Sequence, residues 1–209
     1  EIGSGLVGSE MCIRDREQTL DLTEYNKDSE NPSKIIFYED NFMGIASESL
    51  CEEEMQEQYE MLKKQLSKIV EEKSEEAEDR ELFKYYGILA ELLSKKANIN
   101  RRIRNAYQTD DNDKLCVCRQ ELLRIGELAE NLRIQRQKLW MEEYKPFGYE
   151  LIDIRFAGVS ARARSEAARI EAFTEGRLEH IEELEVELLP CRVPNLWDRM
   201  ISAGNMEGV

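Results

Sequence analysis

The spacing of apolar residues from about Leu50 onward is the feature that most constrains the fold of this chain. These residues recur every three or four positions, which places them on one face of an α-helix. Helix-breaking residues are scarce, with 11 glycines and 4 prolines in 209 residues, whereas glutamate, leucine, lysine and arginine are abundant. The pattern therefore predicts an all-α fold, a bundle of about four long antiparallel helices joined by short links.

Breaks in this pattern separate four apolar stripes. The charged segment 71–80 divides the first stripe from the second, and the Asn- and Asp-rich segment 105–113 divides the second from the third. The third stripe ends at Lys145-Pro146, because proline cannot continue a helix and forces the preceding residue out of α geometry. We expect the fourth helix to begin near Glu150. The stripes span Met55–Ile69, Leu82–Ile103, Leu115–Leu139 and Val159–Leu188.

The residues before the first stripe follow a different pattern. Asn31-Pro32-Ser33 is a turn signal, and the apolar run Ile35–Tyr38 is β-branched and aromatic, which is typical of a strand. A loop with a glycine follows this run. We therefore divide the chain into a short irregular or strand-like connector at 17–48, a helical bundle domain at 49–189, and a C-terminal tail at 190–209.

Residues 1–16 have no apolar period and no helix cap. Read back into codons, the stretch LVGSEMCIRDR at 6–16 resembles a transposase-based sequencing adapter with its mosaic end, and residues 1–5 fit the neighbouring primer and index. The alternative is a natural disordered N-terminus. We exclude 1–16 from fold reasoning, as one would an expression tag, and expect the natural chain to extend upstream of Glu17.

Charge and composition exclude several classes of partner. The formal net charge is -15, and phosphate recognition needs a basic surface, so we predict neither a nucleic-acid nor a membrane partner. No apolar run reaches the roughly 20 residues of a membrane span. The cysteines after residue 16 are expected to be reduced thiols, although four cysteines could also pair. They are Cys51, Cys116, Cys118 and Cys191.

A search for catalytic or metal-binding residues finds no constellation. His180 is the single histidine and lies among glutamates, which favours a solvated surface position over a triad. Asp110–Asp113 imitates a calcium loop but lacks its glycine and distal glutamate. Cys116 and Cys118 are too closely spaced for a zinc knuckle. We therefore predict no catalytic, cofactor-binding or metal-ligating residue in this chain.

Three passages carry a family resemblance. Trp140 and the KPFG sequence at 145–148, followed by Asp153-x-Arg155, resemble the helical C-terminal domain of bacterial β-N-acetylhexosaminidases of glycoside hydrolase family 20. The passage NPSKIIFYEDNFMG at 31–44 is similar to the segment that follows the catalytic barrel in that family, with Asn41 in place of proline. Residues 195–203 resemble its C-terminal end. The resemblance covers 31–203.

The resemblance implies an activity that resides outside these residues. In such exo-enzymes an Asp-Glu pair on a (β/α)8 barrel removes terminal N-acetylhexosamine with retention, and the substrate's own acetamido group is the nucleophile. A barrel needs roughly 250 residues of alternating strands and helices, which 17–209 cannot supply. We therefore expect this chain alone to be inactive, and its parent to be a cytoplasmic bacterial enzyme without a cofactor.

The resemblance also suggests what the helical domain does. We expect it to pack on the barrel, in part through Ile35–Tyr38, and to support a homodimer, so that glycans are met only through the barrel. Asp40 is a candidate for approaching the sugar site, and the simpler alternative is that it caps its own loop. The residues expected to serve packing or dimerisation are Trp140, Phe147, Arg155, Arg162 and Trp197.

Two questions stay open at this stage. Arg155, Arg162, Arg164 and Arg169 are expected to form ion pairs with acidic helices, within the bundle or across a dimer. The rival to the hydrolase fragment is a free-standing acidic scaffold protein whose amphipathic faces bind partner helices.

Overall fold

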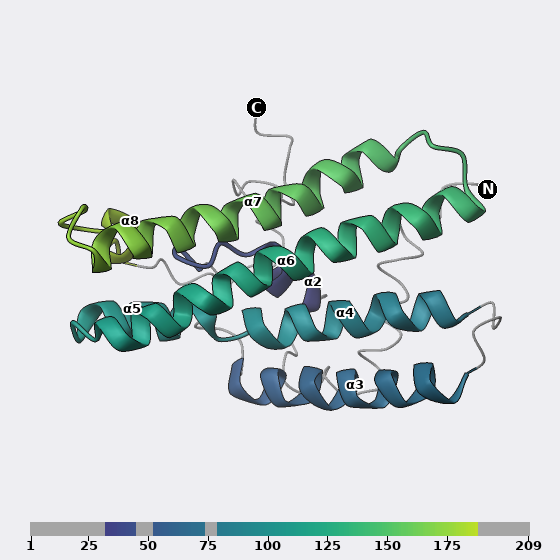
Figure 1. The fold of residues 1–209 in the computed structure, drawn as a ribbon, viewed down its shortest axis with the longest axis horizontal. Coiled ribbons are helices and arrows are strands. Elements are labelled where there is room, and N and C mark those ends of the chain that lie inside the picture. Colours follow the sequence, from purple (N-terminus) through teal and green to yellow (C-terminus); the bar gives the residue numbers. More distant parts are fainter. Residues whose placement is uncertain (1–31, 45–51, 74–78, 188–209) are drawn as a thin grey trace.

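The computed structural model describes residues 32–44, 52–73 and 79–187 (Figure 1). Every regular element in these ranges is an α-helix, which confirms the all-α prediction. The long helices are α3 (Glu52–Glu72), α4 (Arg80–Lys96), α6 (Asn112–Glu143) and α7 (Tyr149–Thr174). The short helices are α2 (Pro32–Tyr38), α5 (Ile99–Gln108) and α8 (Glu182–Glu185).

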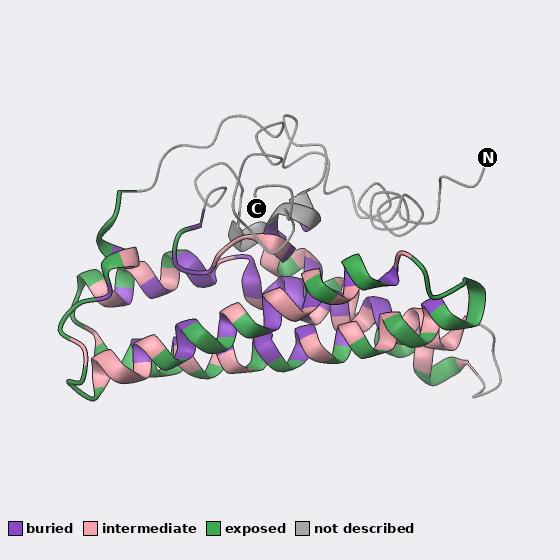
Figure 2. Cartoon of the chain, turned by 90° about the horizontal axis from the view of Figure 1, so that it is seen from above, coloured by how far each residue is buried: buried purple, intermediate pink, exposed green. Residues whose placement is uncertain are grey.

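The long helices lie side by side, and consecutive ones run in opposite directions (Figure 1). The most extensive contact is between α6 and α7, and α3 packs on α4. The contact of α6 with α4 joins these two helix pairs, and α5 also packs on α6. Buried residues follow the inner faces of the helices and exposed residues follow the outer faces (Figure 2). This is the arrangement that amphipathic helices require in order to remove their apolar stripes from water.

The apolar core forms two clusters along the length of α6 and α7. One cluster joins α2, α3 and α4 to the C-terminal half of α6 and the N-terminal half of α7. The other joins α5 and α8 to the opposite halves of α6 and α7. The third predicted stripe lines both clusters. Its buried members are Leu115, Cys118, Leu122, Ile125, Ala129 and Leu132.

The second predicted stripe is divided between two helices. α4 ends at Lys96 and α5 begins at Ile99, and Asn98 between them has non-helical dihedrals (φ -128°, ψ 7°). The Asn98 side chain does not cap α5, and its Nδ2 instead donates to Gln56 Oε1 of α3, so the junction is tied to a neighbouring helix. The apolar period continues across the junction because both helices bury the same side of the chain against α6.

The fourth helix is shorter than predicted, because α7 ends at Thr174 and does not reach Leu188. Gly176 has φ +72°, a left-handed conformation that glycine adopts without steric cost, and the Arg177 amide donates to the Ala172 carbonyl at 2.8 Å. The chain then reverses direction. After this turn, Ile181 is buried in the second core cluster, and its amide donates to the Tyr107 hydroxyl of α5 at 3.1 Å.

The expectation of a strand-like connector is wrong at Ile35–Tyr38, because this run belongs to helix α2. Ser33, Ile36 and Phe37 lie at spacings of three and four and are all buried, so they share one helical face. Proline at the first helical position is also favourable, because no helical N–H bond is lost there.

The core side chains of α2 contact the bundle itself. The Phe37 ring lies 4.9 Å from the Phe156 ring, and Ile36 belongs to the same core cluster. Ile36 and Phe37 are therefore not available for the contact with a barrel that was expected of this run.

Some predictions fall on residues outside the described ranges. These are Cys51, Cys191, Trp197, and the segments 1–31 and 188–209. Within the described ranges, none of the helices combines the length and the apolar character that crossing a membrane requires.

Candidate functional site

The residues first considered for metal or acid–base chemistry do not converge in the described part of the chain. His180 lies in the exposed segment between α7 and α8, with its Nδ1 3.0 Å from Glu185 Oε1. Asp111 caps α6 by accepting the Lys114 amide at 3.0 Å. Across 32–44, 52–73 and 79–187, no group of three or more His, Cys, Asp or Glu side chains could hold a metal ion.

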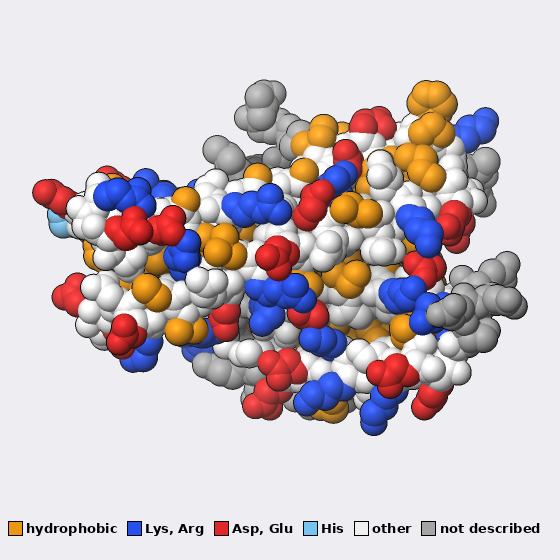
Figure 3. Space-filling model, in the orientation of Figure 1, with side chains coloured by type: hydrophobic (Ala, Val, Ile, Leu, Met, Phe, Trp, Pro, Cys, Tyr) orange, Lys and Arg blue, Asp and Glu red, His pale blue; other side chains and the backbone are white. Residues whose placement is uncertain are grey.

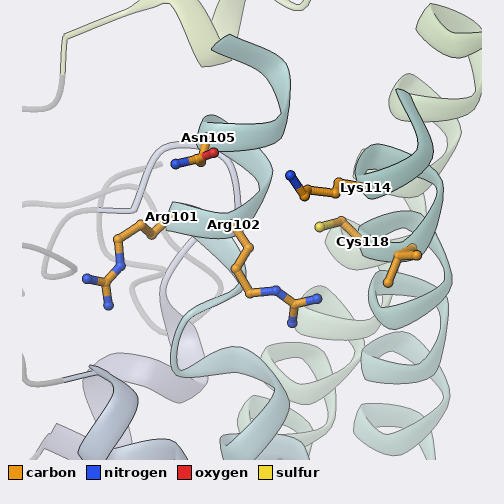
Figure 4. A pocket seen from close by; sticks show the side chains of 6 residues that line it. Arg101, Arg102, Asn105, Lys114 and Cys118 are labelled. Atoms are coloured by element: carbon orange, nitrogen blue, oxygen red, sulfur yellow. The ribbon is translucent and has the colours of Figure 1, made fainter. Parts of the chain in front are cut away.

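A hollow of about 490 Å³ lies between α5 and α6, lined by Arg101, Arg102, Asn105, Lys114, Val117 and Cys118. Arg102 and Lys114 reach into it, whereas Arg101 and Asn105 extend away from α6 (Figure 4). Both inward cations already have ion-pair partners, Glu121 and Asp111. Burial raises the pKa of the Cys118 thiol, which disfavours a reactive thiolate. These side chains therefore do not present a common binding point.

The most elaborate polar arrangement surrounds the loop Glu39–Gly44 that follows α2. We call this loop, together with the side chains of Lys96, Asn100, Arg104, Arg162 and Glu166 that bind it, the connector clasp. Those side chains come from α4, α5 and α7, so helices that are distant in sequence converge on one loop.

Lys96 and Asn100 bind backbone carbonyls of the loop, and Lys96 also binds the Asn41 side chain. Lys96 Nζ donates to the Glu39 carbonyl at 2.7 Å and to Asn41 Oδ1 at 3.1 Å. Asn100 Nδ2 donates to the carbonyls of Asn41 and Phe42 at 3.0 and 2.7 Å. Lys96, Asn100, Asn41 and Phe42 are buried and Glu39 is partly buried, so these bonds satisfy carbonyl and amide groups that water reaches poorly or not at all.

Glu166 holds the loop from the side of α7. Its side chain has no exposed surface, and its two oxygens accept the Asn41 amide at 3.1 Å and Asn41 Nδ2 at 2.5 Å. A proline at this position would have neither donor. Asn41, the departure from the family pattern, is therefore the residue that pairs with Glu166.

Asp40 has the loop-capping contacts that the simpler alternative predicted. Its Oδ1 accepts the amides of Phe42 and Met43 at 3.0 and 2.9 Å. Its Oδ2 accepts Arg162 Nε at 2.6 Å, and the same Nε lies 3.3 Å from Glu166 Oε1. An approach of Asp40 to a sugar stays a prediction.

Burial and neighbouring charges set the ionisation of the clasp. Burial, followed by the charge of Asp40, raises the pKa of Glu166 to about 8, against the opposing effects of Asn41, Arg162 and Lys96. Burial lowers the pKa of Lys96 despite its acidic neighbours. Burial also opposes ionisation of Asp40, but the bonds from Arg162 and the loop amides outweigh it and hold the pKa of Asp40 below its usual value.

Arg104 connects the loop to the chain that follows α7. Its Nε donates to the Phe42 carbonyl at 3.0 Å, and its terminal nitrogens donate to the carbonyls of Glu183, Leu184 and Val186 at 2.9 to 3.1 Å. The Phe42 side chain is fully buried in the second core cluster. One arginine thus fixes the connector and the segment around α8 to the same end of the bundle.

Comparison with models of known protein families gives one match. The family model of the Glycoside Hydrolase 20C C-terminal domain matches residues 11–201. The chain belongs to this family. The match confirms the resemblance and includes the connector, the clasp and the bundle helices in one unit. No curated protein matches the chain.

In this family 20C C-terminal domain, the packing candidates have different positions. Trp140 is buried at the end of α6, where its Nε1 donates to the Lys145 carbonyl at 2.8 Å and so stabilises the turn before Pro146. Phe147 is 83% exposed in that turn. Arg162 belongs to the clasp, and Arg155 Nε is a buried atom without a hydrogen-bond partner.

Two of the four α7 arginines, Arg162 and Arg169, form the predicted ion pairs within the 20C domain. Arg169 contacts Glu182 and Glu183 at 2.7 Å, so it connects α7 to α8. Arg164 instead packs over α6, where a Cβ added to Gly126 would lie 3.2 Å from Arg164 Cγ. Ser160 Oγ donates to the Gly126 carbonyl at 2.8 Å. Gly126 therefore permits the close approach of α6 and α7.

Sequence reasoning missed the clasp residues of the 20C domain other than Asp40, Asn41 and Arg162. A signal was present, because Lys96 and Asn100 lie on the apolar stripe next to Ile99 and Ile103, and Glu166 lies three residues from Ala163 on the stripe of α7. Charged side chains are almost never fully buried unless they are paired. A polar residue on an apolar stripe therefore indicates a buried partner.

Proposed function

We propose that this chain is the C-terminal structural part of an exo-β-N-acetylhexosaminidase of family 20, and that its own task is to fix the connector that leads from the catalytic barrel. The barrel would remove terminal N-acetylhexosamine from glycans by substrate-assisted, retaining hydrolysis. The membership of the chain in the 20C family supports the hydrolase part of this proposal.

The connector clasp is the observation that carries the structural role. A flexible linker would need few contacts, whereas this loop is bound by side chains from α4, α5 and α7. Ordering a loop costs roughly 1–2 kcal/mol per residue in backbone entropy, and the buried hydrogen bonds offset this cost. We infer that the clasp sets the direction in which the connector meets the bundle, and thereby how the bundle sits on the barrel.

Asp40 and Glu166 are poor candidates for a catalytic pair of their own. Each oxygen of both carboxyl groups accepts a hydrogen bond from this chain, and Glu166 has no exposed surface. An acid–base residue must come within hydrogen-bond reach of a substrate atom or a water molecule. The two carboxyl groups are thus better suited to holding the loop, which agrees with our expectation that this chain alone does not hydrolyse glycans.

The same proposal includes a homodimer and a bacterial cytoplasmic location, with no cofactor. The alternative function is the free-standing acidic scaffold. The two alternatives differ in what precedes the bundle, since only the hydrolase requires a barrel upstream in the same reading frame.

A long sequencing read of the source DNA across the codon for Glu17 would test the proposal. We expect an open frame upstream that encodes a barrel with an adjacent Asp-Glu pair. The product of that frame should release chromophore from an aryl N-acetyl-β-glucosaminide, and purified 1–209 should not. A start codon directly before Glu17, or release by 1–209 itself, would contradict the proposal and favour the scaffold or an unrecognised site.

A further inference from the structure

Helix α7 carries a second stripe on the face opposite its buried one. Its members recur at alternating spacings of three and four, the heptad spacing of a helix that packs against another helix. We call this stripe the α7 seam, and Phe147 extends it into the turn before the helix. The seam consists of Leu151, Ile154, Gly158, Ala161, Ser165, Ala168 and Ala172.

The seam is apolar and accessible. Ile154 is 49% exposed and Leu151 is 43% exposed, and Ala161, Ser165 and Ala168 are also exposed. Apolar side chains gather over the end of the molecule where α6 turns into α7 (Figure 3). An exposed apolar surface of this kind is typical of a protein contact.

Residue size along the seam indicates what packs there. The N-terminal half carries the large side chains, and the C-terminal half carries only small ones. In an antiparallel pair of identical seams, Leu151 meets Ala168, Ile154 meets Ser165, and Gly158 meets Ala161. Each outer layer then combines one large and one small side chain, and the two helices can approach closely at the centre. A parallel pair would leave the small half loosely packed, and close packing is the rule in protein contacts.

The charges beside the seam are compatible with such a pair. Arg155, Arg162 and Arg169 each follow a seam residue by one position and so line one edge. Asp40 neutralises Arg162, and Glu182 and Glu183 neutralise Arg169.

Arg155 is the remaining member of that row. Among the described residues it has no ion-pair partner. The antiparallel alignment brings it opposite the Asp40–Arg162 pair of a second copy. The Asp40 carboxylate is 22% exposed there, and an arginine can share it.

We propose that two copies of this chain associate through the α7 seam in an antiparallel arrangement. The inference rests on the homodimer in the proposed function and deepens it by naming the face, the orientation and the layers of contact.

Light scattering during size-exclusion chromatography of the full chain tests the face. Ala161→Glu brings two carboxylates together near the two-fold axis, and we expect it to weaken the dimer at least tenfold. The matched control is Ile134→Glu, which also adds a charge at an exposed position (48% exposed) but lies on α6, outside the seam. Ser165→Arg is the second seam variant, should Ala161→Glu lose its helical circular dichroism. A monomeric wild type, or a dimer that persists in the folded seam variants, would refute the proposal.

Cysteine cross-linking tests the orientation. An antiparallel seam predicts that Leu151→Cys and Ala168→Cys chains form a disulfide when mixed but not when oxidised separately, whereas a parallel pair predicts the reverse. Peptide mass spectrometry separates these links from those of the exposed native Cys116. Links within each single variant, or no link in the mixture, would overturn the antiparallel arrangement. These readouts need no barrel and no activity, so their failure would leave the assignment as a hydrolase domain standing.

Discussion

Replacing Lys96 with methionine should destabilise the whole chain, because the change removes the ammonium group that holds the connector loop. Methionine keeps most of the apolar stem of the lysine. The Glu39 carbonyl and Asn41 Oδ1 would lose donors at 2.7 and 3.1 Å. A buried acceptor left without its partner costs about 1–3 kcal/mol. Relief of the burial that lowers the pKa of Lys96 returns part of this cost.

The expected net loss is about 3 kcal/mol in the free energy of unfolding, or about 6–12 °C in Tm for a chain of this size. Urea unfolding followed by circular dichroism measures it. Lys95→Met is the matched control, because Lys95 is a neighbouring, only partly buried lysine outside the clasp, and we expect a loss below about 0.5 kcal/mol. A loss below about 1 kcal/mol for Lys96→Met, or equal losses for the two variants, would refute the reasoning.

Three further predictions concern the clasp and the helix contacts. Asn41→Pro removes both donors to Glu166 and should cost about 2–4 kcal/mol in urea unfolding; an unchanged midpoint would show that the loop is not held through Glu166. The pKa of Glu166 is raised to about 8, so the stability that its proton contributes is complete below about pH 4.5 and is lost as the pH rises to 8. The Tm of the wild type relative to Glu166→Gln should therefore fall between pH 5 and 9, and a constant difference would contradict a titrating Glu166. Gly126→Val should cost about 1–3 kcal/mol in thermal unfolding, because even a Cβ would lie 3.3 Å from the Ser160 carbonyl. Gly87→Ala, at an open helix position, should instead stabilise by about 0.5–1 kcal/mol, and the same sign for both variants would count against the close approach.

The helical bundle was predictable because its signals are local. The stripe from Leu115 to Leu132 has a helical period, and Pro146 ends it, so neither statement needs knowledge of the neighbouring helices. The same local reasoning identified α3 and its charged break at 71–80. The family was also predictable, because Trp140, the KPFG turn and the passage at 31–44 have a distinctive order.

Short elements were harder to predict because their local signals compete. Ile35–Tyr38 is too short to show a full helical period, and its β-branched and aromatic residues favoured a strand. In the structure this run is helical, and the helix lets Ile36 and Phe37 pack together into the first core cluster. The end of α7 was also hard to predict, because a single glycine such as Gly176 can be tolerated inside a helix. In the structure the helix ends just before Gly176, and Ile181 in the segment that follows is fully buried.

Periodicity within the chain was enough to predict the all-α class and the apolar faces of the long helices, because it acts over a few turns of one helix; it did not predict the break between α4 and α5 or the end of α7. The connector clasp, in contrast, follows from how the helices pack together. Lys96, Asn100 and Glu166 are separated by up to 70 residues, and their polarity on apolar stripes has a reason only when the loop from Glu39 to Gly44 lies against them. Burial makes each of these polar groups costly alone, and the shared loop makes them favourable together.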